Sequence, residues 1–81
     1  MRMTEAVAKR IDALCRERMT TVNEVTKTAG MNSATIYSIF KGRSQNPSLM
    51  TIQLICEGFG ITVRAFFDDP LFDDLELPED K

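Results

Sequence analysis

The sequence contains no histidine and no tryptophan among its 81 residues. Histidine is the commonest general base in enzymes and the commonest metal ligand in proteins. We also find no nucleophile–base pair and no cluster of metal-ligating residues in the chain. We therefore expect no catalytic residue, no metal and no cofactor, and an enzyme ranks last among the possible functions.

Long apolar runs are also absent. No stretch approaches the roughly 20 apolar residues that span a bilayer, and the first residues, MRMTEAVAKR, lack the apolar core of a signal peptide. The only cysteines, Cys15 and Cys56, lie among apolar residues in predicted helices, as buried thiols do in a reducing cytosol. We expect a cytoplasmic protein of one domain, without a disulfide, a membrane partner or a separate domain for a small-molecule ligand.

Basic residues are scarce at the C-terminal end. Residues 1–67 carry nine Lys/Arg and five Asp/Glu, whereas residues 68–81 carry seven Asp/Glu and one Lys, within a net charge of −2. We divide the chain accordingly into a basic domain, 1–67, and an acidic tail, 68–81.

The acidic tail also contains the large apolar residues Leu71, Phe72, Leu75 and Leu77. One interpretation is a frayed, solvated tail. The other is a segment docked on its own domain or on a partner subunit, because disordered tails normally contain fewer large apolar residues. The sequence leaves both open.

Glycine occurs only four times, and Gly30 divides the stretch 22–41 into two short amphipathic segments. Thr21-Val-Asn-Glu24 has the form of a capping box at the start of the first segment. Each segment carries an apolar stripe, and glycine permits the sharp turn between them. The stripes are Val22, Val25 and Ala29, then Ile36, Ile39 and Phe40. Two short helices joined in this way make a helix-turn-helix unit.

Three further helices flank this pair. The first is expected to begin at a Thr4 cap and to run to about Arg18. The fourth follows a Ser48 cap and ends near Gly60, and the fifth follows a Thr62 cap and ends before Pro70. Their predicted buried residues are Val7, Ile11 and Leu14, then Leu49, Ile52, Ile55, Cys56 and Phe59, then Val63, Phe66 and Phe67. The pattern predicts an all-α, compact five-helix fold in which helices two and three form the helix-turn-helix.

Several motifs match one family in order along residues 7–67. They are Ala29-Gly30-Met31, Ser33 to Ile39, Lys41-Gly42, Asn46 to Leu49, Thr51 to Ile55, Phe59 to Val63 and Phe66-Phe67. This chain resembles the XRE family of Cro- and phage-repressor-like helix-turn-helix regulators, which implies a lambda-repressor-like DNA-binding domain. Two positions depart from the family pattern: Val22 replaces a common glutamine, and Thr26 replaces a common alanine. Thr26 fits if its hydroxyl bonds back to a preceding carbonyl.

The resemblance implies that a recognition helix, about residues 32–41, enters the major groove of double-stranded DNA. The expected base contacts are Asn32, Ser33, Ala34, Tyr37 and Ser38, and the expected phosphate contacts are Thr21, Asn23, Thr35, Lys41 and Arg43. Each of these residues also has an explanation without DNA. Ser33 to Thr35 could form an ordinary first helical turn, and Tyr37 could be exposed without a role. Lys41 and Arg43 could serve only to keep the chain soluble.

The side chains expected to contact bases are small, so direct readout is limited and a single domain should bind weakly. We therefore expect a homodimer on a pseudo-palindromic site, with Phe67, Leu71, Phe72 and Leu75 as contacts. The resulting interpretation is a transcriptional regulator, a repressor of bacterial, phage or plasmid type. The alternative is a protein-interaction module, such as an antitoxin or assembly partner, with residual DNA binding.

Overall fold

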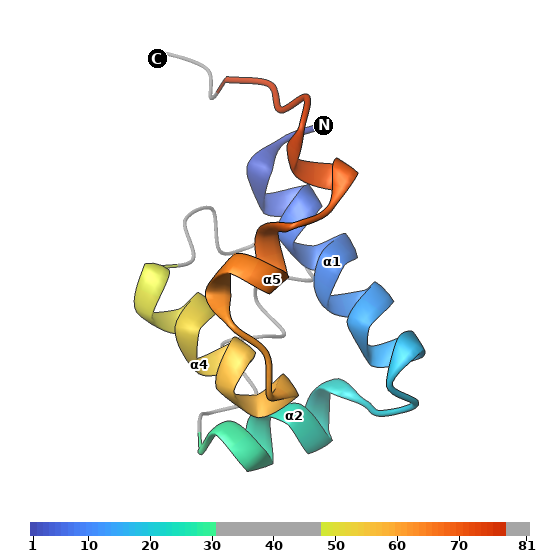
Figure 1. Ribbon diagram of the computed structural model, residues 1–81, viewed down its shortest axis with the longest axis vertical. Coiled ribbons are helices and arrows are strands. Elements are labelled where there is room, and N and C mark those ends of the chain that lie inside the picture. The colour runs from blue at the N-terminus through green and yellow to red at the C-terminus, as the bar shows by residue number, and fades with distance from the viewer. Residues whose placement is uncertain (31–47, 78–81) are drawn as a thin grey trace.

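The computed structural model describes residues 1–30 and 48–77, and this part of the chain is helical without any strand. It contains α1 (Met3–Glu17), α2 (Val22–Ala29), α4 (Leu49–Phe59), α5 (Val63–Phe67) and the 3₁₀ helix η1 (Pro70–Phe72). In Figure 1, α1 and α4 lie on opposite sides, α2 lies at one end and α5 lies between them. The predicted all-α class is confirmed. The expected third helix, about residues 32–41, falls outside the described residues.

Three of the four predicted N-terminal caps are confirmed. The hydroxyls of Thr21, Ser48 and Thr62 accept hydrogen bonds from the backbone N–H three residues later, at 3.2, 3.0 and 3.0 Å. Each bond pairs one of the N–H groups that the first helical turn leaves without an intrahelical partner. At the other ends, Gly30 and Gly60 adopt left-handed φ values of 70° and 75° and stop α2 and α4.

The predicted cap of the first helix at Thr4 is wrong. The helix begins at Met3 with Arg2 as its N-cap residue, so Thr4 lies inside the first turn. The Glu5 carboxylate accepts the backbone N–H of Arg2 at 3.1 Å. A glutamate at the third helical position reaches back to the N-cap residue, and this contact places the start two residues earlier than the threonine suggests.

The core lies where α1, α2, α4 and α5 meet, and it is almost wholly apolar. Its buried members are Val7, Ile11, Leu14, Cys15, Val25, Ile52, Ile55, Cys56, Phe59 and Phe66. Ile61, the residue before the Thr62 cap, packs against this cluster from the connection between α4 and α5. Most of the predicted apolar stripes are therefore confirmed.

Leu49 and Val63 are exceptions, because Leu49 is 79% exposed and Val63 is 41% exposed. Both residues occupy the first position of their helix. At 3.6 residues per turn, Leu49 lies about 70° away from the middle of the buried stripe of α4. Its predicted burial is wrong for this geometric reason.

Cys15 and Cys56 are free and buried, as the sequence predicted. Burial raises the pKa of both thiols above the ordinary value, and the negative charge of Asp12 adds to the effect at Cys15. At Cys56 the positive charge of Arg10 opposes it. Both thiols therefore remain protonated in the core at neutral pH.

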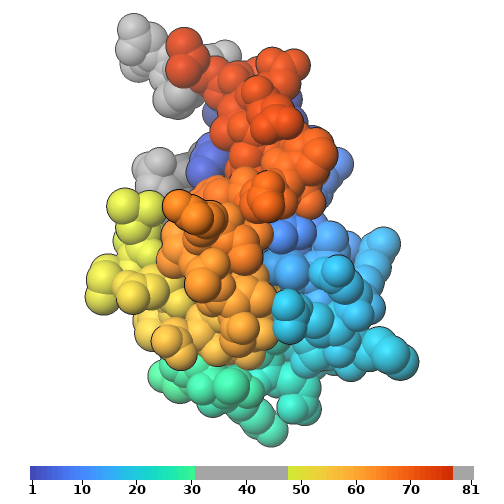
Figure 2. Space-filling model, viewed as in Figure 1, coloured from blue at the N-terminus to red at the C-terminus, as the bar shows by residue number. Residues whose placement is uncertain are grey.

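The first part of the acidic tail docks on its own domain. The Phe72 ring centroid lies 4.9 Å from that of Phe67 and 6.1 Å from that of Phe66. Farther along, the Glu76 N–H donates to the Met1 carbonyl at 3.0 Å, and the Glu76 carboxylate pairs with the Met1 ammonium at 3.0 Å. Figures 1 and 2 show this segment beside the N-terminal end of α1. Of the two interpretations of the tail, docking holds for residues 70–76.

Candidate nucleic-acid interface

The N-terminus of α2 presents a group of hydrogen-bond donors to solvent. Thr21 and Asn23 are exposed, and the Thr21 oxygen already accepts the Glu24 N–H. The Thr21 hydroxyl proton can therefore still be donated outward. The N–H groups of Val22 and Asn23 belong to the first turn, before intrahelical pairing begins. Hydroxyl and N–H donors at the positive end of a helix suit a phosphate oxygen.

Thr26 is buried inside α2, and its hydroxyl donates to the Asn23 carbonyl at 2.9 Å. This is the back-bond that the sequence required for a threonine at this position. The bond satisfies the buried hydroxyl within its own helix. The departure from alanine is thus accommodated without moving the N-terminal turn.

The exposed surface of α2 has two sides. Asn23 and Lys27 lie one turn apart on the first side, and both are exposed. Glu24 and Thr28 lie on the second side, where the Thr28 hydroxyl donates to the Glu24 carbonyl at 3.0 Å. The sequence reasoning missed Lys27, although its spacing from Asn23 was the signal that could have identified it.

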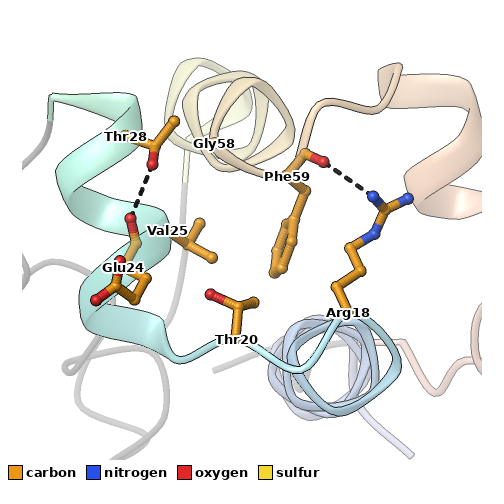
Figure 3. Close-up of a pocket in the computed structure, with 7 residues that line it drawn as sticks. All are labelled: Arg18, Thr20, Glu24, Val25, Thr28, Gly58 and Phe59. Carbon is orange, nitrogen blue, oxygen red and sulfur yellow. Dashed lines mark hydrogen bonds between the residues drawn. The ribbon is translucent and has the colours of Figure 1, made fainter.

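The second side of α2 borders an open hollow of about 250 Å³ between α2, the end of α4 and the end of α1 (Figure 3). Glu24 brings a negative charge to its lining, and the guanidinium of Arg18 already donates to the Phe59 carbonyl at 3.2 Å. A carboxylate at this position repels phosphate, and Arg18 acts as a tie between α1 and α4. The side of α2 that suits an anion is therefore the one with Asn23 and Lys27.

Only two of the predicted DNA contacts, Thr21 and Asn23, belong to the part of the chain that the structure describes, and they lie together at the start of α2. The remaining predicted contacts fall outside it. They are Asn32, Ser33, Ala34, Thr35, Tyr37, Ser38, Lys41 and Arg43. Gly30 ends α2 and is the last described residue before them.

Within 1–30 and 48–77, no group of three or more His, Cys, Asp or Glu side chains is arranged to hold a metal ion. None of the helices found there has the length and apolar character needed to cross a bilayer.

Comparison with known proteins agrees with this geometry. Residues 10–69 match the family model of the Cro/C1-type HTH DNA-binding domain. The fold is similar to the crystal structure of the prophage Lp1 protein 11, with a TM-score of 0.80 and 34% sequence identity over 93% of this chain and 100% of that chain. No curated protein matches. The family match spans most of the chain and confirms the resemblance read from the motifs. The chain belongs to the Cro/C1-type helix-turn-helix family of DNA-binding regulators.

Proposed function

We propose that the protein is a sequence-specific transcriptional repressor of bacterial, phage or plasmid type that acts in the cytoplasm or nucleoid. Residues 1–67 form the DNA-binding domain, and residues 68–81 form its acidic tail. The observation that carries the proposal is the exposed N-terminal part of α2, where Thr21 caps the helix and Asn23 and Lys27 lie on one exposed side. A repressor needs no ligand domain, because occupying a promoter is sufficient to block transcription.

The proposed contacts include α2 and the segment after Gly30, about residues 32–41. We place this segment in the major groove. Asn32, Ser33, Ala34, Tyr37 and Ser38 contact bases. Thr21, Asn23, Thr35, Lys41 and Arg43 contact phosphates, and Lys27 is added to this second set because it lies one turn after Asn23 on the same exposed side.

A homodimer on an inverted repeat provides the affinity that these small side chains do not supply. Phe67, Leu71, Phe72 and Leu75 are proposed to contact the second subunit. They are half-buried against their own chain, so part of each side chain is available to a partner. The two recognition segments then read half-sites about one helical turn apart.

Selection from random DNA with the purified protein tests the repressor proposal. A short inverted repeat should be enriched, and Ser38→Ala should change the base preference. Lys27→Gln should weaken binding to all sequences and reduce the slope of log K against log salt by about one. Lys9→Gln, which removes the same charge from the exposed face of α1, is the matched control. If the two lysine variants weakened DNA binding equally, Lys27 would not contact DNA.

A protein-interaction module remains the second candidate, because Leu49 and Met50 at the start of α4 are 79% and 67% exposed. Adjacent exposed apolar side chains occur at protein contacts. If no DNA sequence is enriched at low salt, the repressor proposal fails and this candidate replaces it.

A further inference from the structure

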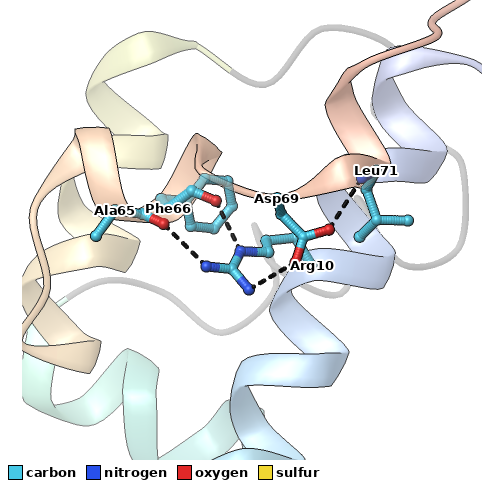
Figure 4. A network of polar contacts seen from close by, with 5 residues as sticks. All are labelled: Arg10, Ala65, Phe66, Asp69 and Leu71. Atoms are coloured by element: carbon cyan, nitrogen blue, oxygen red, sulfur yellow. Dashed lines mark hydrogen bonds and ion pairs between the residues drawn. The ribbon is translucent and has the colours of Figure 1, made fainter.

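Arg10 is the most heavily engaged charged side chain among the described residues, and all its bonds go to the C-terminal part of the chain (Figure 4). Its Nε donates to the Phe66 carbonyl at 2.7 Å, and its Nη2 donates to the Ala65 carbonyl at 2.9 Å. Its Nη1 pairs with the Asp69 carboxylate at 3.2 Å. The Arg10 side chain is only 14% exposed, so water screens this ion pair less than a surface pair.

Asp69 connects Arg10 to the start of η1. One carboxylate oxygen, Oδ2, faces Arg10, and the other, Oδ1, accepts the Leu71 N–H at 2.9 Å at the start of η1. Helix η1 then brings Phe72 against the rings of Phe66 and Phe67. We call residues 68–77 the C-terminal strap. Arg10 holds it to α1, and the Phe72 ring holds it to α5. Contacts between Met1 and Glu76 hold its far end to the start of the chain.

The strap lies at the end of the molecule away from α2 (Figure 1). Four exposed carboxylates, those of Asp68, Asp73, Asp74 and Glu76, are carried with it. While the strap is closed, these negative charges stay away from the end of α2 that is proposed to contact phosphates. The position of these charges affects DNA binding, because phosphate contacts dominate DNA affinity and a nearby negative charge weakens them.

The chain is long enough for an open strap to reach that end. The nine residues from the end of α5 to Glu76, the last of these carboxylates, extend to about 31 Å when fully stretched. The molecule measures 37 × 24 × 19 Å, and the strap begins at the end of α5 rather than at the far tip. An open strap can therefore carry its carboxylates toward the end of the molecule where α2 lies, and there they compete with DNA phosphates.

We propose that the Arg10–Asp69 contact is a latch, and that opening it releases the acidic strap as an internal competitor of DNA. The competitor is this chain's own segment 68–77. The proposal rests on the DNA-binding function proposed above. It assigns a role in DNA affinity to residues that lie outside the DNA-contacting surface.

The test measures the dissociation constant for DNA of the full chain at low salt. Arg10→Gln and the milder Asp69→Asn, which keeps Oδ1 as the acceptor for Leu71, should each weaken binding about tenfold. Adding Asp73→Asn, Asp74→Asn and Glu76→Gln to either variant should restore the affinity to within about twofold of a chain with these three changes alone. Lys9→Gln controls for the lost charge of Arg10.

Hydrogen exchange separates opening of the strap from unfolding of the domain. In both latch variants the N–H groups of Leu71 and Glu76 should exchange faster, while that of Ile55 in α4 keeps its rate. The latch is overturned if Arg10→Gln and Asp69→Asn bind DNA like Lys9→Gln, or if neutralising the strap fails to restore binding. A wild-type chain that binds no DNA overturns the repressor proposal itself, and the latch with it.

Discussion

Met19 occupies a backbone conformation that its side chain makes costly. It lies in the connection between α1 and α2 with φ of 54°, the only positive φ outside glycine among the described residues. The left-handed region costs an L-residue roughly 1–2 kcal/mol, because Cβ approaches the following carbonyl oxygen. The Met19 side chain is 93% exposed, so burial does not offset this cost.

Met19→Gly should therefore raise the free energy of unfolding. Part of the gain is cancelled by the greater freedom of glycine in the unfolded chain, and the net effect should be about 0.5–1 kcal/mol. Urea unfolding followed by circular dichroism measures it. Gln53→Gly, at an exposed position in the interior of α4, should instead lower the stability by about 1 kcal/mol. A loss of stability in Met19→Gly would show that the exposed side chain makes stabilising contacts.

At the scale of elements, the placement of α2 depends on its close crossing with α4. A Cβ at Gly58 would lie 2.6 Å from the Val25 carbonyl oxygen, 2.8 Å from Val25 Cγ1 and 3.3 Å from the Ala29 Cβ. Glycine within a helix costs about 1 kcal/mol relative to alanine. The close approach explains why it is present, because a larger residue would push the two helices apart.

Gly58→Ala should for this reason destabilise the protein by roughly 1–3 kcal/mol, although alanine is the better helix former. It should also weaken DNA binding, since α2 would move relative to the rest of the domain. Urea unfolding and DNA titration measure the two effects. Gln53→Ala, on the exposed face of the same helix, is the control and should be nearly neutral. A stabilised Gly58→Ala variant would mean that the crossing relaxes without cost.

Features that depend on residues close in sequence could be predicted, and features that depend on distant residues could not. The caps at Thr21, Ser48 and Thr62 were predictable, because the hydroxyl and its N–H partner are three residues apart. The role of Gly58 was not, because it depends on the backbone of another helix. At the candidate site, Thr21 was placed correctly at the start of α2. Lys27 was missed, although its spacing of four residues from Asn23 places both on one face of a helix.

For the whole molecule, the uneven distribution of charge was visible in the sequence, but its arrangement in space was not. Sequence alone left open whether the acidic tail docks. The outcome depends on contacts between distant residues, such as Arg10 with Asp69 and Phe72 with Phe66. These contacts keep an acidic segment at one end of the molecule while α2 lies at the other. Keeping the acidic segment away from α2 favours approach to DNA with the α2 end first.

The two buried thiols make the stability of the whole molecule dependent on pH. Cys15 and Cys56 belong to the same core cluster, and burial raises the pKa of each above its value in the unfolded chain. Above the ordinary thiol pKa of about 8.5, the unfolded chain loses these protons more readily than the folded chain. Unfolding then releases protons, so the folded state loses stability as pH rises.

Between about pH 8.5 and 9.5, the free energy of unfolding should therefore fall as the pH rises. Urea unfolding at several pH values measures this slope. In a chain carrying both Cys15→Ala and Cys56→Ala, the fall over this range should be much smaller, whatever the absolute stability of that variant. The comparison cancels the titration of other groups, because both chains share them. An identical slope in the two chains would mean that the thiols titrate alike in the folded and unfolded states.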